Sequence, residues 1–512
     1  MNKKILIAII ALIIIICAGA FAMTNANSGG SASVDIDANA LEERGNLVVD
    51  SEDISAENGY YSSSTADENT VLVKNGGALK LVKSLINKTG DTASTGDDAD
   101  FYGINSAVLV NSNGTLDISN VEIETNSKGS NGIFVTNGES SAGAGDVGAG
   151  SGSGSGGAPD AQAGSGDNSD GGTPPSMPGD SSGASDANSG GQGGASPSGN
   201  SETADGSSEA NVENVKITTH SDKSRGLDAT YNGIINAKNV EINTNGQSCA
   251  ALATDRGEGE VHVSNSVLNT GVDQQSGRGS PIIYSTGNIT VDDSKGCAYV
   301  SQIACIEGKN SIELNNCDLS AYAEGNRQDN GNYVDLGGVF IYQSMSGDAD
   351  VGTSTFSASK SVLSIESESS VYKEAPMFHV TNTKAIINLE GTELNFGSGV
   401  LLNVSGQNQW GSEGSNGGDV SFNAVDEILD GDIIIDSIST LNLSLSSTSF
   451  NGAINPSGDF GDTSVTIDSG SDWTLDGDSY ITSLTNNGKI EYNGHTLYVN
   501  GKAYTESNPY NG

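Results

Sequence analysis

Two stretches, NVKITT at 214–219 and NVEINT at 239–244, decide the fold because they are near copies of each other. The pattern returns in looser form around Asn265, Asp292 and Asn315. Successive copies lie 25, 26, 27 and 23 residues apart. An imperfect period of about 25 residues is typical of a solenoid, in which each repeat buries its apolar side against its neighbours.

Each repeat contains short runs in which apolar and polar residues alternate, as in Val215 and Ile217 or Val261 and Val263. Alternation with period two, rich in β-branched residues, predicts strands with one face inward. Gly, Asn, Asp and Ser separate the runs, as at Asn232-Gly233, and these residues form tight corners. With no helix pattern between the strands, the sequence predicts an all-β fold, with each repeat forming one coil of a single-stranded parallel β-helix.

Residues 1–22 predict an export signal, because Lys3-Lys4 precedes an unbroken apolar run, Ile5–Ile16, and a small-x-small site, Ala20-Phe21-Ala22. The run is short for a full membrane span. We expect cleavage, with an uncleaved anchor as the alternative. A lipid on Cys17 is disfavoured by the bulky residue before it. The protein is therefore expected to be secreted or at the cell surface, with membrane association only through the signal segment.

The polar stretch 23–65 is expected to be an N-terminal cap and leader, because a solenoid needs its open ends covered. Strand runs predict the β-helix over 66–504, followed by a C-terminal tail, 505–512. Within it, 138–208 lacks aromatics, Lys and Arg, and Gly, Ser, Asp and Pro dominate. This composition predicts a long disordered low-complexity loop inserted at one corner. A shorter inserted loop is expected at Thr89–Tyr102.

The chain is strongly acidic, with 65 Asp and Glu against 22 Lys and Arg and a net charge of −43. This balance argues against nucleic acid as a partner, since nucleic-acid affinity comes from Lys and Arg that neutralise phosphates. It also argues against polyanionic substrates unless calcium bridges them. No cofactor is expected. Structural calcium is the alternative, because Asp-x-Asp runs occur, as at 348–350, although no EF-hand loop does.

Four cysteines follow the signal, and an exported protein could oxidise them. If Asp292 and Asn315 occupy equivalent places, Cys297 and Cys317 lie near one corner of adjacent coils and form a candidate disulfide. The preferred alternative is burial as small apolar side chains. Asn-x-Ser/Thr triplets give candidate N-glycosylation sites, although chance explains most of them in so Ser- and Thr-rich a chain. These sites are Asn87, Asn113, Asn288, Asn403 and Asn442.

Charged and aromatic residues recur just before the glycine corners of successive repeats. If the repeats stack in register, these side chains form a ladder along one edge of the solenoid. Such a ladder predicts either salt bridges and ring stacking that stabilise the solenoid, or a groove that binds a glycan or peptide. We define the predicted ladder as Arg225, Asp228, Tyr231, Asp255, Arg256, Tyr284, Glu307, Lys309, Tyr342 and Gln343.

Motifs for catalysis are missing from the sequence. The four histidines are scattered, and no nucleophile elbow or His-Glu-x-x-His site occurs in a suitable context. Asp292-Asp293 stands alone, without the Gly-His-Gly run of polygalacturonases. We therefore expect a protein that is not an enzyme and assign neither a catalytic residue nor a metal site. Carboxylates from distant repeats can nevertheless meet, because stacked coils bring them within about 5 Å.

An export signal, an acidic Ser/Thr/Asn/Gly-rich solenoid and the runs SRGLDATY at 224–231, ATDRG at 253–257, IEGKNS at 306–311 and YQSMSG at 342–347 together form a recognisable combination. It resembles prokaryotic adhesin-like surface proteins with a pectin-lyase-like right-handed parallel β-helix. The resemblance implies a non-catalytic protein that binds a glycan or protein on a cell or matrix surface. The alternatives are a polysaccharide-active enzyme (a lyase or glycoside hydrolase) of the same fold and a mechanical spacer. The oligomeric state is left open.

Overall fold

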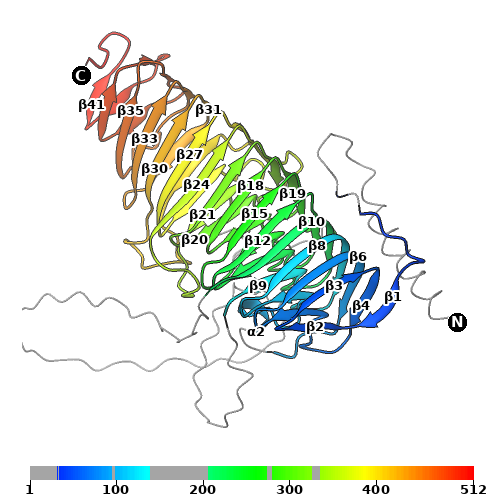
Figure 1. The fold of residues 1–512 in the computed structure, drawn as a ribbon. Helices are drawn as coiled ribbons and strands as arrows, with labels where there is room; N and C mark the ends of the chain where they lie inside the picture. Colours follow the sequence, from blue (N-terminus) through cyan, green and yellow to red (C-terminus); the bar gives the residue numbers. More distant parts are fainter. Residues whose placement is uncertain are drawn as a thin grey trace, which may run out of the picture.

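The computed structural model describes residues 32, 34–94, 98–138, 206–273, 279–325 and 335–511. Within these ranges the protein is all-β, with long parallel sheets in an elongated rod and one helical turn, α2 (Asp98–Phe101) (Figure 1). The arrangement is compatible with a parallel β-helix. None of these ranges contains a helix long and apolar enough to cross a membrane. The predicted signal and most of the predicted 138–208 loop lie outside the described residues.

Two large parallel sheets run along the rod. The first, called the short sheet, has 12 strands. In order along the rod they are β2 (Leu47–Asp50), β5 (Val71–Lys74), β7 (Val108–Val110), β9 (Ile133–Thr136), β11 (Leu227–Thr230), β14 (Leu252–Thr254), β17 (Ile283–Ser285), β20 (Ala304–Glu307), β23 (Val339–Tyr342), β26 (Phe378–Thr381), β29 (Val400–Val404) and β32 (Asp432–Ile435).

The second, called the long sheet, has 22 strands. They are β1 (Glu42–Gly45), β3 (Asp53–Glu57), β4 (Gly59–Ser63), β6 (Ala78–Thr89), β8 (Thr115–Asn126), β10 (Ser208–Thr219), β12 (Gly233–Lys238), β13 (Glu241–Thr244), β15 (Glu260–Ser264), β16 (Val267–Thr270), β18 (Asn288–Asp292), β19 (Lys295–Ala298), β21 (Ser311–Asn315), β22 (Asp318–Ala321), β24 (Thr353–Ser359), β25 (Val362–Ile365), β27 (Lys384–Glu390), β28 (Glu393–Asn395), β30 (Asp419–Val425), β33 (Thr440–Ser446), β35 (Asp462–Ile467) and β38 (Ser483–Asn486). Two small sheets lie towards the C-terminus. One contains β31 (Ile428–Asp430), β34 (Ser449–Asn451), β36 (Asp472–Thr474) and β39 (Lys489–Glu491), and the other β37 (Ser479–Ile481), β40 (Leu497–Val499) and β41 (Lys502–Tyr504).

The chain passes through both large sheets once per repeat. From β11 it runs through β12 and β13 before it returns to the short sheet at β14. Because β12 pairs with β15 while β13 pairs with β16, the long sheet has two rows of strands. We call the row that follows the short sheet the first row, and one passage from a short-sheet strand to the next a coil. The strands β6, β8 and β10 run through both rows.

The asparagine that marks each repeat forms the corner between the two rows. Asn214, Asn239 and Asn265 have φ angles of 53°, 53° and 50°, in the left-handed region that Asn tolerates. At the next two coils the corner is Asp293 and then Asn316, one residue beyond the positions predicted from the pattern. The amide of Asn316 donates a hydrogen bond to the carboxylate of Asp293 (2.6 Å), which links these corners.

Alternation along each strand separates core from surface. In β12, Ile235 and Ala237 are buried, whereas Asn236 is half-buried and Lys238 is exposed. The inward residues of successive coils stack, and one cluster of buried apolar side chains extends along the rod. The alternation predicted from the sequence therefore does produce one inward apolar face per strand.

The two ends of the predicted 138–208 loop meet at one corner. Asn137 Nδ2 donates to Gly206 O (3.1 Å), and Ser208 Oγ donates to Asn137 Oδ1 (3.1 Å). On either side the register continues, since β8 pairs with β10 and β9 pairs with β11. The predicted loop boundary needs one correction, because Ser208 is the buried first residue of β10 rather than part of the loop.

The first coil begins inside the stretch predicted as an N-terminal cap. The strands β1 to β4 lie within it, and β2 and β3 already pair with β5 and β6. The predicted boundary at residue 65 is therefore wrong. The alternation of Leu47 with Val49 is short, and the strands on either side of it begin with charged residues, Glu42 and Asp53. The apolar pattern of this coil is therefore weak in the sequence.

An antiparallel hairpin closes the C-terminal end of the rod, because β40 pairs with β41 in the antiparallel sense. Tyr510 lies in the stretch predicted as a tail. Its OH donates to Leu484 O (2.7 Å), and its N–H donates to the hydroxyl of Tyr492 (2.8 Å). Tyr510 of the predicted tail thus packs on the end of the rod, whereas residues 506–509 are exposed.

The predicted disulfide between Cys297 and Cys317 is not formed. Both are free thiols, because the register puts Cys297 of β19 opposite Ser320, whereas Cys317 follows the corner residue Asn316. Cys317 is 2 % exposed and belongs to the core cluster. Its place agrees with the alternative reading as a small apolar side chain.

Candidate functional site

The predicted ladder lies on the outer face of the short sheet. The strands β11, β14, β17, β20 and β23 are consecutive there. Asp228 and Tyr284 share one column, and Glu307 pairs with Tyr342. The repeats therefore stack in the register that the ladder requires. Contacts from α2 and from loops 344–350 and 405–417 cover this face.

Arg225 is the centre of a buried charge cluster. Its guanidinium forms ion pairs with Asp255 (2.8 Å), Asp100 of α2 (3.1 Å) and Asp228 (3.4 Å). The exposed fraction is 8 % for Arg225, 4 % for Asp255 and 0 % for Asp228. Lys223 brings a second cation to Asp100 (2.8 Å). The cluster thereby fixes the loop that contains α2 to a residue 125 positions later in the sequence.

The carboxyls of this cluster differ in their pKa values. Burial raises the pKa of Asp255 to about 6, although Arg225 opposes the rise. Burial and the negative charge of Asp255 raise the pKa of Asp228 well above its usual value. Asp100 is the exception, because the charges of Arg225 and Lys223 outweigh its burial and lower its pKa. The pair Asp228 and Asp255 therefore holds a proton more readily than ordinary carboxyls.

The loop that contains α2 is held by two further contacts. The guanidinium of Arg256 lies 4.2 Å from the centre of the Phe101 ring, and its Nε donates to Asp348 (3.2 Å). The ring of Tyr102 stacks on Tyr231 with centres 5.5 Å apart and planes 1° from parallel. One face of Tyr231 is thus occupied from within the protein, so this ring does not offer that face to a sugar.

Glu307 is the centre of a second buried group. Its carboxylate accepts hydrogen bonds from Tyr284 OH (2.8 Å), from Tyr342 OH (3.0 Å) and from the hydroxyl of Ser344. The residue is 2 % exposed. Burial raises the pKa of Glu307, and the three hydroxyls oppose the rise. Aromatic and acidic residues therefore do meet across coils, but the carboxylate of Glu307 and the two tyrosine hydroxyls bond to each other.

Aromatic side chains complete this cover. Trp410 lies 5.4 Å from Phe340 and 5.1 Å from Tyr342 between ring centres. Phe340 also meets the ring of His379 edge-on at 5.2 Å, and His379 Nε2 lies 2.8 Å from Gln407 Nε2. Burial lowers the pKa of His379 to about 4, so the imidazole is neutral at physiological pH.

The two remaining ladder residues, Lys309 and Gln343, lie at the edge of the covered face. Lys309 pairs with Glu258 (2.6 Å) and Asp350 (3.1 Å), and Gln343 Nε2 donates to Ala349 O (3.2 Å). Each of the ten ladder residues thus contacts a partner within the protein. Their grouping in space is established, whereas their role in ligand binding stays a prediction.

The outer face of the first row differs, because no loop covers its polar side chains where the structure describes it. One residue per coil points outward in a continuous register, and each is exposed or half-buried. We call this series the polar column: Lys80, Asp117, Asn211, Asn236, His262, Thr290, Glu313, Ser357, Asn388, Asn423, Ser444 and Thr466.

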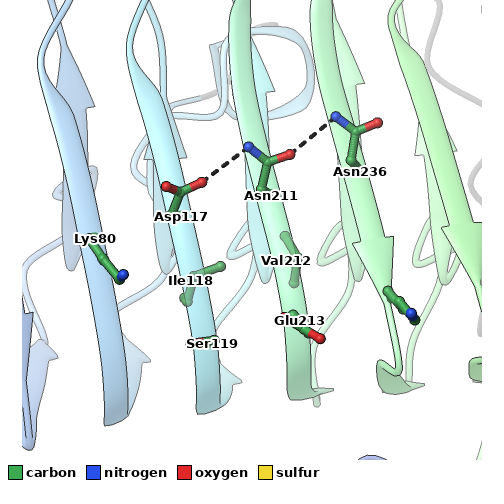
Figure 2. A pocket seen from close by; sticks show the side chains of 9 residues that line it. Lys80, Asp117, Ile118, Ser119, Asn211, Val212, Glu213 and Asn236 are labelled. Atoms are coloured by element: carbon green, nitrogen blue, oxygen red, sulfur yellow. Dashed lines mark hydrogen bonds between the residues drawn. The ribbon is translucent and has the colours of Figure 1, made fainter.

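Side-chain amides in the polar column bond from coil to coil. Figure 2 shows Asn236 Nδ2 donating to Asn211 Oδ1 (3.3 Å) and Asn211 Nδ2 donating to Asp117 Oδ1 (3.1 Å). Further along the rod, Asn423 Nδ2 donates to Asn388 Oδ1 (2.9 Å). The bonds hold the amides in fixed orientations, which lowers the entropic cost of presenting them to a ligand.

An open groove of about 420 Å³ lies over the N-terminal part of this column. Two cations and two carboxylates are placed around the amides, so the groove is electrically balanced within a very acidic chain. Its lining residues are Lys80, Asp117, Ile118, Ser119, Asn211, Val212, Glu213, Asn236 and Lys238 (Figure 2).

The polar column was not predicted from the sequence. A signal for it exists, because Asn211 and Asn236 stand at equivalent places one repeat apart and occupy the outward positions of alternating runs. The sequence reasoning used this alternation only to find the inward residues.

No group of three or more His, Cys, Asp or Glu is placed to hold a metal ion within the described ranges. The nearest arrangement is the convergence of Asp100, Asp228 and Asp255, whose centre is taken by the guanidinium of Arg225. This convergence of carboxylates therefore does not offer a site for structural calcium.

No protein-family model matches the chain, and no curated protein is significantly similar to it in sequence.

Proposed function

We propose that this protein is a secreted or cell-surface, adhesin-like right-handed parallel β-helix that binds a glycan or protein without catalysis. The observation that supports this most is the polar column, in which oriented amides and hydroxyls repeat on a bare face. Adjacent strands are about 4.8 Å apart, so an extended polymer on this face can meet an equivalent group on every coil. Many weak contacts of this kind add up to useful affinity.

Charge narrows the ligand class. The chain carries a net charge of −43, so a polyanion is repelled over most of the surface. The groove balances Lys80 and Lys238 against Asp117 and Glu213, which suits a neutral polar chain. A neutral oligosaccharide, rich in hydroxyls that accept from amides and donate to carboxylates, is the ligand this surface fits best.

One observation favours the alternative of a polysaccharide-active enzyme. Asp228 and Asp255 lie on adjacent coils with raised pKa values beside a guanidinium, which are groups suited to acid–base chemistry. Both carboxyls are buried beneath α2, however, and a substrate would have to displace Asp100 to reach them. Geometry therefore supports the binding protein over the enzyme.

A glycan array, with and without calcium and scored for both retention and cleavage, tests the proposal. The protein is compared with the double variant Asn211→Ala/Asn236→Ala. The matched control is Asn243→Ala/Asn269→Ala, since Asn269 Nδ2 donates to Asn243 Oδ1 (3.0 Å) in the same way on the second row. We expect retention of neutral glycans, weakened about tenfold by the first double variant only, in keeping with the loss of one or two hydrogen bonds.

Cleavage of any glycan would favour the enzyme and overturn the proposal. Retention that falls equally in both double variants would place the binding surface elsewhere.

A further inference from the structure

The two ends of the rod differ in whether their terminal coil is covered by further residues. At the C-terminal end, the antiparallel hairpin β40–β41 and Tyr510 cover the last coil. At the N-terminal end, β2 pairs only with β5 and β3 pairs only with β6 among the described strands. The first coil therefore has a free side that faces away from the rod (Figure 1).

Apolar side chains are partly uncovered at this free side. Leu47 and Ile54 pack against the core but remain half-buried. Their partners in the second coil, Val71 and Leu79, are 0 % and 2 % exposed because a third coil lies over them. Val49 of β2 is itself 0 % exposed, so the apolar surface that lacks a described neighbour is formed by Leu47, Ile54 and Ala56.

Among the described residues, no strand pairs with the outer edge of β2 or β3. Ala78 N–H donates to Glu52 O (2.9 Å) and Asn58 N–H donates to Val82 O (3.2 Å), which fixes the direction of every peptide group in β3. Because alternate groups of a strand point to opposite edges, the N–H groups of Asp53, Ser55 and Glu57 point away from β6. An edge of this kind is a template for another strand.

Acidic side chains surround this edge. Residues 42–57 contain six Asp and Glu and one Arg. On the side towards the rod, lysines of the second coil form ion pairs with two of these acids. Lys74 pairs with Asp50 (3.3 Å), and Lys83 pairs with Glu57 (3.6 Å). The segment that already pairs with this coil, residues 70–88, therefore combines apolar strand residues with four lysines.

We propose that the N-terminal edge, formed by β2 and β3, binds an extended segment of a partner polypeptide that combines apolar and basic residues. The segment adds as a parallel strand beside β3. Its apolar side chains cover Leu47, Ile54 and Ala56, and its lysines or arginines meet Glu52 and Asp53, the exposed acids at the edge.

Other occupants fit less well. A second copy would bring an identical ring of acids against this one, which is repulsive. The described residues just before β1 are engaged elsewhere, because Ile36, Ala38 and Leu41 pack against Tyr60 and Leu85.

The test measures binding of a synthetic peptide to the full chain by fluorescence anisotropy. The peptide copies residues 70–88, TVLVKNGGALKLVKSLINK, the segment that pairs with β2 and β3 on their other edge. We expect binding that weakens at least tenfold between low and high salt. A peptide with glutamate in place of its four lysines should not bind.

Two variants locate the site. Ser55→Pro removes an edge N–H and should abolish binding, whereas Ser55→Ala should not, and circular dichroism checks that both fold. Glu52→Lys/Asp53→Lys should weaken binding at least tenfold. The matched control is Glu390→Lys/Glu393→Lys, which makes the same charge change at two exposed acids far along the rod and should leave binding within about twofold.

Absence of binding, or binding that ignores both edge variants, overturns the proposal. Binding only after removal of residues 1–31 would identify the chain's own N-terminal segment as the occupant, and end-to-end dimers that Ser55→Pro dissociates would identify a second copy. Either result also overturns it.

Discussion

Two outer faces of one rod, built from the same repeat, are used in opposite ways. On the short sheet, charged and aromatic side chains point outward and are then covered by α2 and two loops, so that Arg225 and Glu307 are buried. On the first row of the long sheet, amides and hydroxyls point outward and stay bare. The charged and aromatic residues of the short sheet are therefore paired within the protein, whereas the polar column of the first row forms the accessible surface.

The difference follows from the cost of leaving such groups in each environment. A buried ion cluster needs every charge paired, because removing one partner leaves an uncompensated charge in a medium of low dielectric constant. An exposed amide ladder exchanges its hydrogen bonds with water at little cost. Substitutions on the two faces should therefore differ strongly in their effect on stability.

The largest effect is expected at Arg225. Arg225→Met removes the cation from between Asp100, Asp228 and Asp255, and we expect a loss of about 3–5 kcal/mol in the free energy of unfolding. Urea denaturation measures it. Arg44→Met, which removes an exposed arginine paired with Glu42 (2.9 Å), is the control and should cost about 0–1 kcal/mol. Equal losses would mean that the cluster does not fasten α2.

The next effect is a dependence of stability on pH that comes from the buried carboxyls of the covered face. In the folded protein the pKa of Asp255 is raised to about 6, and that of Asp228 is raised well above 3.8. The folded state therefore binds more protons than the unfolded chain, so this contribution to stability is fully present below about pH 4 and is lost as the pH rises through 6 and beyond.

Asp228→Asn removes one of these titrations. We expect the variant to be more stable than the parent at pH 8 by about 1–3 kcal/mol, the cost of burying a carboxylate whose two oxygens accept no hydrogen bond, with the advantage shrinking towards pH 4. Urea midpoints across this range measure the difference. Parallel pH curves for Asp228→Asn and its parent would contradict the assignment.

The sequence predicted the register of the covered face but not its cover. Period and alternation are local properties of the repeat, so they placed Asp228, Tyr284 and Glu307 on one face of adjacent strands. Part of the cover comes from α2, whose contact with Arg225 spans 125 residues of sequence. No periodic signal reports such a contact, because the loop at Thr89–Tyr102 belongs to no repeat.

The bare face was readable in principle. Every inward residue of an alternating strand implies an outward neighbour, so Ile235 and Ala237 imply Asn236 between them. What the sequence does not reveal is whether another segment covers that outward residue. The accessible surface is for this reason harder to predict than the core, even in a periodic fold.

A smaller effect is expected where the cover is thin. Arg256 stacks on Phe101 and pairs with Asp348, and its side chain is 36 % exposed. Arg256→Ala should cost about 1 kcal/mol, which corresponds to about fivefold faster hydrogen exchange of the α2 amides when exchange occurs by local opening. Arg256→Lys keeps the charge but cannot stack its side chain flat on Phe101. Its α2 amides should therefore exchange at a rate between those of the parent and of Arg256→Ala. Unchanged exchange would show that the Arg225 cluster alone holds the loop.

The smallest effect is expected on the bare face. Asn211→Ala and Asn236→Ala each remove an exposed side-chain hydrogen bond, so each should change the free energy of unfolding by no more than about 0.5 kcal/mol. Urea midpoints of the two variants and the parent are the measurement. A loss above 1 kcal/mol would mean that the amides stabilise the solenoid, and the bare face would then be a structural ladder like the covered one. If stability is unchanged, any loss of ligand in these variants is a loss of contacts on the surface itself, because the strands that present it remain in place.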